Sequence, residues 1–125
     1  MHTPFLGLRT VIYLVDDIAQ AKAWYAKALG IEPYFDEPFY VGFNVGGFEL
    51  GLQPVEGDAR PGPGGVTAYW GVEDVAATYQ MLLEAGAGVA EEPTEVGGGI
   101  IVAAVRDPWG NLFGIIYNPH FPNVS

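Results

Sequence analysis

The side chains that could carry out chemistry are few in this chain. It contains no cysteine and its only serine is Ser125, so the sequence offers no thiolate nucleophile and, in practice, no Ser-His-Asp triad. Its two histidines, His2 and His120, lie near the two ends and form neither an H-x-E nor an H-x-x-x-H pattern. Among the carboxylates, Glu49 is the one whose sequence surroundings point to a site.

Glu49 lies in a segment that alternates in polarity. Apolar residues occupy every second position of the segment 48–53, and Glu49, Gly51 and Gln53 occupy the others. A period of two predicts a strand with two different faces. We expect the apolar face to pack beneath a helix and the other face to line a cleft. There a carboxylate can anchor a cationic or hydrogen-bond-donating ligand, or act as a general base.

An internal repeat indicates which elements would position this strand. Residues 10–18 match residues 67–75 position for position, 57 residues apart. Each copy is a β-branched and aromatic run that ends in an acidic pair, which predicts a strand followed by the start of a helix, with Asp17 and Asp74 as N-cap residues. The predicted helices cover 18–29 and 75–85, and glycines follow them at Gly30 and Gly86.

Short strands follow each predicted helix. In the first half they lie around 33–35, 40–45 and 48–53, with a hairpin turn at Gly46-Gly47, and in the second half around 89–90, 100–105 and 112–117. The sequence therefore predicts one α+β domain over residues 1–125, built from two β-α-β-β-β repeats. The first repeat covers about 8–54, a linker rich in Gly and Pro covers about 55–65, and the second repeat covers about 66–118.

The same alternation assigns the first strand of each repeat. It places Thr10, Ile12 and Leu14 on the cleft side, and the repeat adds Thr67, Tyr69 and Gly71.

Composition limits the class of partner. Half of the 125 residues are apolar, enough for a core, and the net charge of −10 repels phosphate backbones, so nucleic acid is excluded as a partner. A neutral or cationic ligand is easier to accept than an anion. No apolar run approaches the ~20 residues that span a bilayer, and the first residues lack the features of a signal peptide. We therefore expect a cytoplasmic protein with no membrane partner.

The order of elements and three motifs resemble the vicinal oxygen chelate superfamily, which includes glyoxalases, bleomycin resistance proteins and extradiol dioxygenases. The motifs are residues 15–18 leading to Trp24-Tyr25 and Leu29-Gly30, residues 71–75, and the turn at residues 106–112. The resemblance covers nearly the whole chain. It implies a curved mixed sheet around a cleft.

Metal-dependent members of that superfamily place a histidine on the first strand of each half and a carboxylate or similar ligand on the last. The corresponding positions here are Thr10, Thr67, Gly51 and Gly114, and none is a metal ligand of normal strength. Glu49 lies near Gly51, but one carboxylate does not make a divalent site. The resemblance therefore implies no metal and no cofactor, with small residues that leave room in the cleft unless bulky neighbours fill it.

The branch that this pattern resembles most is the metal-free, bleomycin-resistance-like one. It implies a protein that binds a small organic ligand, neutral or cationic, as in antibiotic or metabolite sequestration, and that works as a homodimer. The expected ligand contacts are Thr10, Ile12, Glu49, Gly51, Gln53, Thr67, Tyr69, Trp109 and Gly114. The alternatives are a glyoxalase-type lyase or isomerase or a dioxygenase-like enzyme, for which the sequence offers no ligand set, and an interaction module with a vestigial cleft.

Overall fold

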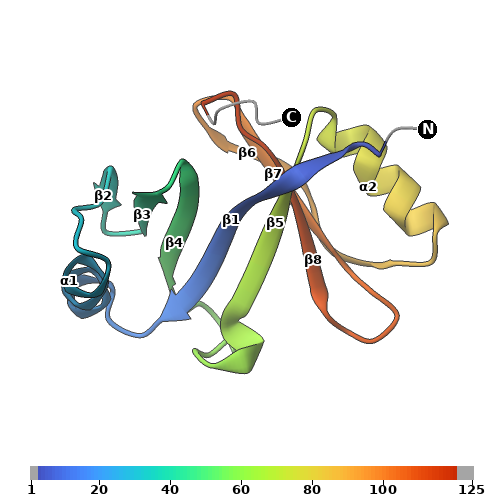
Figure 1. Cartoon of the computed structure of the whole chain (residues 1–125). Coiled ribbons are helices and arrows are strands. Elements are labelled where there is room, and N and C mark those ends of the chain that lie inside the picture. The colour runs from blue at the N-terminus through green and yellow to red at the C-terminus, as the bar shows by residue number, and fades with distance from the viewer. Residues whose placement is uncertain (1–2, 121–125) are drawn as a thin grey trace. The chain divides into compact units, whose positions relative to one another are not determined.

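The computed structural model describes residues 3–120. Along the chain the elements are β1 (Phe5–Val15), α1 (Ile18–Leu29), β2 (Phe35–Glu37), β3 (Tyr40–Val45), β4 (Phe48–Pro54), the short 3-10 helix η1 (Pro63–Gly65), β5 (Val66–Val72), α2 (Val75–Glu84), β6 (Gly88–Gly97), β7 (Ile100–Arg106) and β8 (Leu112–Tyr117) (Figure 1). This order confirms the two predicted β-α-β-β-β repeats. Contacts divide the described chain into a first unit, residues 10–67, and a second unit, residues 3–9 with 68–120.

The sheet of the first unit has the strand order β2-β3-β4-β1. β1 and β4 are parallel, whereas β2, β3 and β4 are antiparallel neighbours. Helix α1 begins where predicted, because the Asp17 carboxylate accepts a hydrogen bond of 3.0 Å from the backbone N–H of Gln20. It ends at Gly30, whose φ of 75° is a left-handed conformation that glycine adopts without strain.

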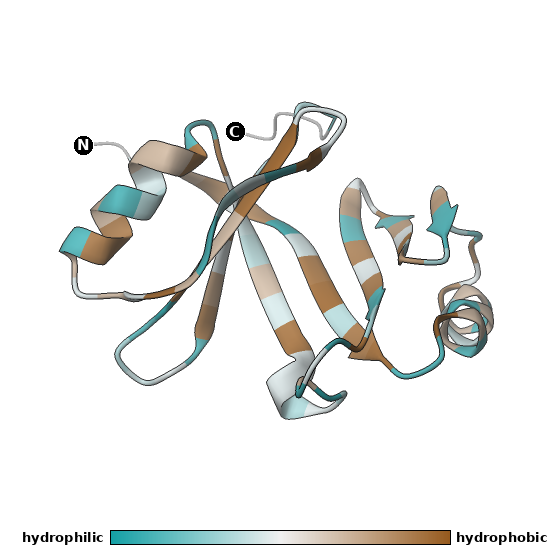
Figure 2. Ribbon diagram, turned by 180° about the vertical axis from the view of Figure 1, so that it is seen from behind, coloured by the Kyte–Doolittle hydropathy of each residue, from teal (hydrophilic) through white to brown (hydrophobic). Residues whose placement is uncertain are grey.

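Helix α1 covers one face of that sheet. The core of the first unit is formed by Val41, Phe43 and Leu52, and residues of β1, β4 and α1 such as Tyr13, Leu50 and Tyr25 pack against it. The prediction that Leu50 and Leu52 lie under the helix is therefore confirmed. Figure 2 shows the hydropathy changing from residue to residue along the strands, as a two-faced sheet requires. The face that carries Glu49 is the one opposite α1.

The second unit repeats this plan with the strand order β5-β8-β7-β6, of which β5 and β8 are parallel. Asp74 caps α2 by accepting a hydrogen bond of 3.0 Å from the backbone N–H of Ala77. The core under α2 consists of Val72, Val75, Tyr79, Ala103, Val105 and Ile115. Between residues 3 and 120, neither helix has the length and apolar character that crossing a membrane requires.

Three strands differ from their predicted bounds by more than one residue. β1 begins at Phe5, β2 covers Phe35–Glu37 rather than 33–35, and β6 runs over ten residues instead of two. The predicted length of β6 is wrong because the strand is exposed throughout and contains acidic residues and a proline, so it lacks the apolar alternation that indicates a strand. It is the outer strand of its sheet and pairs with β7 through three irregularities of register, which suits such a sequence.

Candidate functional site

Two hydroxyl groups hold the carboxylate of Glu49 in the first unit. The parallel register of β1 and β4 sets Thr10 opposite Glu49. The Thr10 hydroxyl donates a hydrogen bond of 3.0 Å to Oε1 of Glu49, and the Tyr34 hydroxyl donates one of 2.5 Å to Oε2. Thr10 is only 2% exposed, so the atoms packed around it restrict its side chain. Each oxygen of this carboxylate therefore has a defined direction on the face opposite α1.

Among the described residues of the first unit, none forms an ion pair with Glu49. The ion pair Lys22–Asp36 of this unit, at 2.9 Å, does not involve it. Partial burial of the hydroxyl, followed by its hydrogen bond to Glu49 and the charge of Glu49, raises the pKa of Tyr34 well above its ordinary value of 10. Tyr34 is therefore neutral and remains a hydrogen-bond donor throughout the neutral range.

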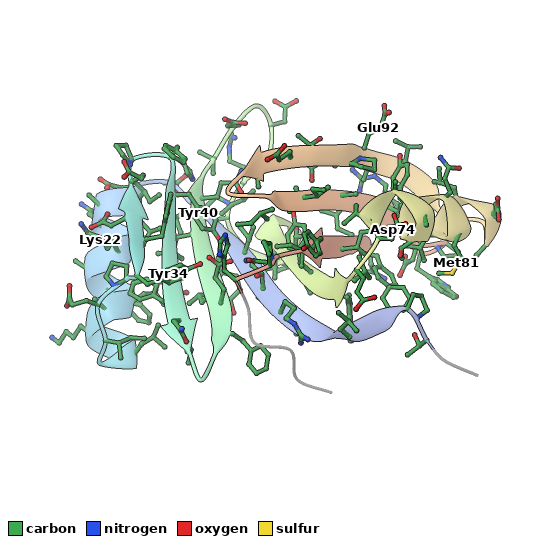
Figure 3. The ribbon with its side chains drawn as sticks, turned by 90° about the horizontal axis from the view of Figure 1, so that it is seen from above. Lys22, Tyr34, Tyr40, Asp74, Met81 and Glu92 are labelled. Carbon is green, nitrogen blue, oxygen red and sulfur yellow. The ribbon has the colours of Figure 1, made fainter. Side chains whose placement is uncertain are left out.

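Two glycines, paired across neighbouring strands, lie beside the Glu49 carboxylate and the tyrosine rings near it. Gly42 of β3 lies opposite Gly51 of β4 in the antiparallel register. A Cβ atom at Gly42 would lie 2.6 Å from Oε2 of Glu49, and one at Gly51 would lie 2.6 Å from Cζ of Tyr40. Tyr34 and Tyr40 lie over this part of the sheet in Figure 3. In this arrangement the side chains of Glu49 and Tyr40 occupy the space that a methyl group at these two positions would need.

The second unit has a corresponding row of residues. Tyr69 of β5, Gly114 of β8, Ala104 of β7 and Glu91 of β6 are successive partners across the four strands. A Cβ atom at Gly114 would lie 2.6 Å from Cδ1 of Tyr69, so the tyrosine ring covers this glycine. Burial and then the charge of Glu91 raise the pKa of Tyr69 to about 12, and partial desolvation of the Glu91 carboxyl raises its pKa, although the residue is exposed.

The register makes Gly51 and Gly114 equivalent positions. Gly51 lies opposite Ile12, and Gly114 lies opposite Tyr69, the residue that matches Ile12 in the repeat. The equivalent register supports the alignment of the two repeats from which Gly51 and Gly114 were selected as expected ligand contacts. In each unit, however, a tyrosine fills the space beside the glycine. The small residues therefore leave no open room at these two positions, as in the alternative that bulky neighbours fill the cleft.

The other expected contacts are distributed more widely. Gln53 lies opposite Leu14 in the first unit, on the same face as Glu49 and Gly51, and Thr67 lies in β5. Trp109 is 83% exposed in the turn between β7 and β8, where Asp107 accepts hydrogen bonds from the backbone N–H groups of Trp109 and Asn111. These hydrogen bonds stabilise the turn, so Asp107 has a structural role here. Their roles in ligand binding stay predictions.

Sequence reasoning did not single out Tyr34 or Glu91. Tyr34 precedes β2 and reaches Glu49 across β3, a contact between residues 15 apart in the sequence. Glu91 lies in the strand whose length was misjudged. The only sequence signal for Tyr34 was its place among several aromatic residues before and after β2.

The residues present do not fit the divalent metal that the metal-dependent members of the resembled superfamily bind. Within residues 3–120, no three side chains among His, Cys, Asp and Glu gather in a way that could hold a metal ion. Thr10, Gly51 and Gly114 offer no metal ligand of normal strength, and Glu49 is a single carboxylate. His120 contacts the backbone oxygen of Gly98 at 3.0 Å, and His2 lies outside the described residues.

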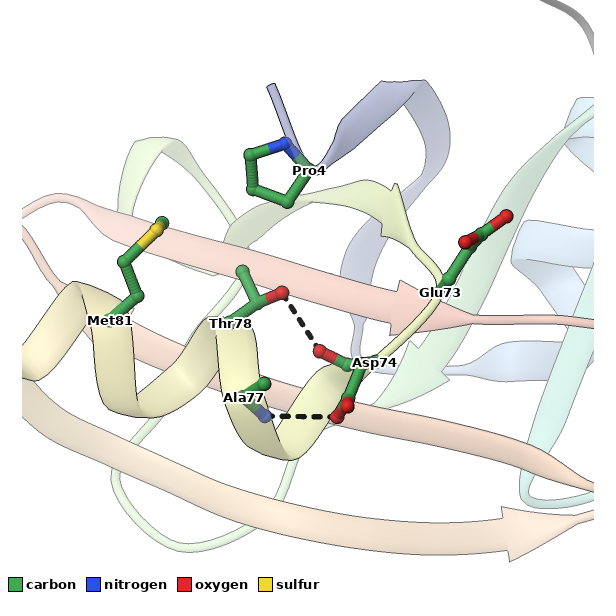
Figure 4. A pocket seen from close by; sticks show the side chains of 6 residues that line it. All are labelled: Pro4, Glu73, Asp74, Ala77, Thr78 and Met81. Carbon is green, nitrogen blue, oxygen red and sulfur yellow. Dashed lines mark hydrogen bonds between the residues drawn. The ribbon is translucent and has the colours of Figure 1, made fainter. Parts of the chain in front are cut away.

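A shallow pocket of about 270 Å³ lies beside α2 in the second unit. It is lined by Pro4, Glu73, Asp74, Ala77, Thr78 and Met81 (Figure 4). The Asp74 carboxylate caps the helix, and the Thr78 hydroxyl donates to the backbone oxygen of Asp74 at 2.8 Å. Since its buried polar groups already have partners, this pocket shows no arrangement for recognising a ligand.

Comparisons with known proteins agree with this architecture. A family model described as Glyoxalase/Bleomycin resistance protein/Dioxygenase superfamily matches residues 7–115. Methylmalonyl-CoA epimerase from Mycobacterium tuberculosis is similar with a TM-score of 0.73 and 20% identity, covering 94% of this chain and 92% of its own. A superfamily member from Vibrio splendidus 12B01 has a TM-score of 0.67 and 23% identity, covering 89% and 99%.

A third similar structure is the Mn(II)-bound glyoxalase from Novosphingobium aromaticivorans, with a TM-score of 0.69 and 25% identity over 93% of this chain and 40% of that one. The first two likenesses, below 25% identity, show the fold alone. A search of curated proteins finds no match.

Proposed function

We propose that this chain, which belongs to the Glyoxalase/Bleomycin resistance protein/Dioxygenase superfamily, is a metal-free protein that binds a small organic ligand and releases it unchanged. Glu49 is its polar anchor, on the face of the first unit opposite α1. Sequestration of an antibiotic or a metabolite is the kind of role that such binding serves. The ligand contact that we assign is the Glu49 carboxylate, which Thr10 and Tyr34 orient.

The observation that carries the proposal is the pair of hydrogen bonds to Glu49. The Glu49 carboxylate is partly buried, is oriented by Thr10 and Tyr34, and has no ion pair within its unit. A ligand that donates hydrogen bonds to it would offset the free-energy cost of this burial. An ionised carboxylate has about four acceptor sites, of which the two hydroxyls use two. The remaining lone pairs are available for hydrogen bonds from a ligand.

Binding is favoured over metal-assisted catalysis by the chemistry of the side chains. A metal-assisted lyase or dioxygenase reaction requires several ligands, and the side chains of the described residues do not supply that set. A protein that only binds its ligand does not require them.

A fragment screen followed by nuclear magnetic resonance tests this function. We expect some fragments to shift the backbone amide signals of Thr10, Gly42 and Gly51, and Glu49→Gln to weaken their binding. Glu32→Gln is the matched control, because Glu32 is an exposed residue of the same unit. If no fragment affects these amides at millimolar concentration, or if Glu49→Gln binds every hit as the unchanged chain does, the proposed function is wrong.

A further inference from the structure

One aromatic ring, Tyr34, bonds to the Glu49 carboxylate, and others share the face of the sheet opposite α1. Phe35 of β2 lies opposite Gly42 in the register and therefore shares its face. The centroid of the Phe35 ring lies 6.1 Å from that of Phe39 and 6.1 Å from that of Tyr40. Tyr40 in turn covers Gly51, and Tyr34 bonds to Glu49. We call Tyr34, Phe35, Phe39, Tyr40 and Glu49 the aromatic cluster.

The rings of the cluster are not part of the core. Tyr34, Phe35 and Phe39 are 56%, 39% and 64% exposed, while the core of the first unit lies on the opposite side of the sheet, under α1. Large aromatic side chains usually bury most of their surface, so three exposed rings beside one another need another explanation. A ligand that lies against their faces would provide it.

The charge around the cluster selects the type of ligand. The strand residues that share this face by register include two carboxylates, Glu37 and Glu49, and no lysine or arginine. The faces of aromatic rings are electrically negative, and they attract organic cations that approach within about 6 Å of the ring centre. Rings and carboxylate therefore favour the same charge in a bound molecule.

We propose that the aromatic cluster binds an organic cation, an alkylated amine or quaternary ammonium group whose charge lies near Glu49 and whose carbon atoms contact the rings of Phe35, Phe39 and Tyr40. This inference rests on the proposed function and names the chemical class of its ligand. Glu49 supplies the charge, the two phenylalanines supply apolar surface and cation–π attraction, and the hydrogen bonds from Thr10 and Tyr34 fix the carboxylate.

A pair of probes with one shape and different charge tests the inference. Choline and 3,3-dimethylbutan-1-ol differ in that the cationic nitrogen of the first is a neutral carbon in the second. Each is titrated into the full isotope-labelled chain at low ionic strength. We expect choline to shift the amide signals of Phe39, Gly42 and Gly51, and the neutral alcohol to bind roughly tenfold more weakly, because it loses both the charge contact and the cation–π attraction.

Variants identify the groups responsible. Glu49→Gln should weaken choline binding about fivefold and leave the alcohol unaffected, and Phe39→Leu should weaken choline about threefold, the range expected for one carboxylate and one ring. Trp24→Leu is the control, because Trp24 of α1 is also 64% exposed but is not in the cluster. It should leave choline binding unchanged.

The outcomes separate this inference from the proposed function. Equal affinity for the two probes, or the absence of choline binding while neutral fragments bind beside Glu49, would overturn the organic cation and leave ligand binding in place. If no molecule of either charge perturbs the cluster, both proposals fail. Signals of the cluster that shift with protein concentration alone would mean that a second copy covers the rings, which also overturns the inference.

Discussion

Replacing Gly114 by alanine tests whether Tyr69 fills the space beside this glycine. The new Cβ atom would lie 2.6 Å from Cδ1 of Tyr69 and 2.8 Å from the backbone oxygen of Ala68. Both distances are below ordinary van der Waals contact, and the second involves backbone of the neighbouring β5, which a side-chain rotation cannot relieve. Overpacking of a core costs about 1–3 kcal/mol.

A smaller favourable effect opposes this clash. In a strand, replacing glycine by alanine recovers roughly 0.5–1 kcal/mol because alanine loses less backbone entropy on folding. We therefore expect Gly114→Ala to lower the free energy of unfolding by about 1–2 kcal/mol, which lowers the melting temperature by roughly 3–8 °C for a domain of this size. Denaturant unfolding followed by fluorescence or circular dichroism measures the change.

A matched substitution separates the clash from the general effect of alanine. Gly88 also lies in a strand of the second unit, and a Cβ atom there would have its nearest neighbour, Cβ of Arg106, at 4.0 Å. Gly88→Ala should therefore leave stability unchanged or raise it by about 0.5 kcal/mol. If Gly114→Ala proves as stable as Gly88→Ala, the space beside Gly114 is open, and the conclusion that Tyr69 occupies it is refuted.

Three further predictions concern ionisation, metal content and assembly. Since the pKa of Tyr69 is raised from 10 to about 12, its contribution to stability is present below about pH 10 and is lost as the pH rises toward about 12. In an ultraviolet titration of the folded chain, Tyr69→Phe should remove a late tyrosinate step; loss of a step near pH ~10 would contradict the assignment. The purified protein should contain no stoichiometric divalent metal, because Thr10, Gly51, Thr67 and Gly114 supply no strong ligand; elemental analysis that finds about one Ni, Zn, Mn or Fe per chain would disprove this. We also expect a homodimer, since exposed aromatic side chains outside the aromatic cluster, such as Trp24 and Trp70, remain on the single chain, and light scattering that gives the monomer mass at micromolar concentration would speak against it.

Local patterns were sufficient to predict most of the elements. The bounds of α1, β3 and β8 agree with the sequence, because an N-cap aspartate, a hairpin of two glycines and a run of β-branched and aromatic residues each act within a few neighbouring positions. The face assignment of β4 was also predicted, since a period of two fixes it independently of the rest of the chain. β6 was underestimated because an exposed edge strand is not stabilised by apolar burial and leaves no such pattern.

The sequence by itself determined that Glu49 lies on the face of its strand that points away from the helix. It also determined that Thr10, Gly51 and Gly114, at the positions compared with metal ligands, are small residues. Only the tertiary structure decided what surrounds them, because pairing of β1 with β4 and of β3 with β4 joins residues that are far apart in the chain. That pairing sets the Thr10 hydroxyl beside Glu49, lets Tyr34 reach it across Gly42, and turns Tyr40 over Gly51. A glycine has no side chain beyond its Cα atom, and this much is known from the sequence. Which neighbour occupies the space that results depends on strand register and side-chain direction, which are properties of the folded sheet.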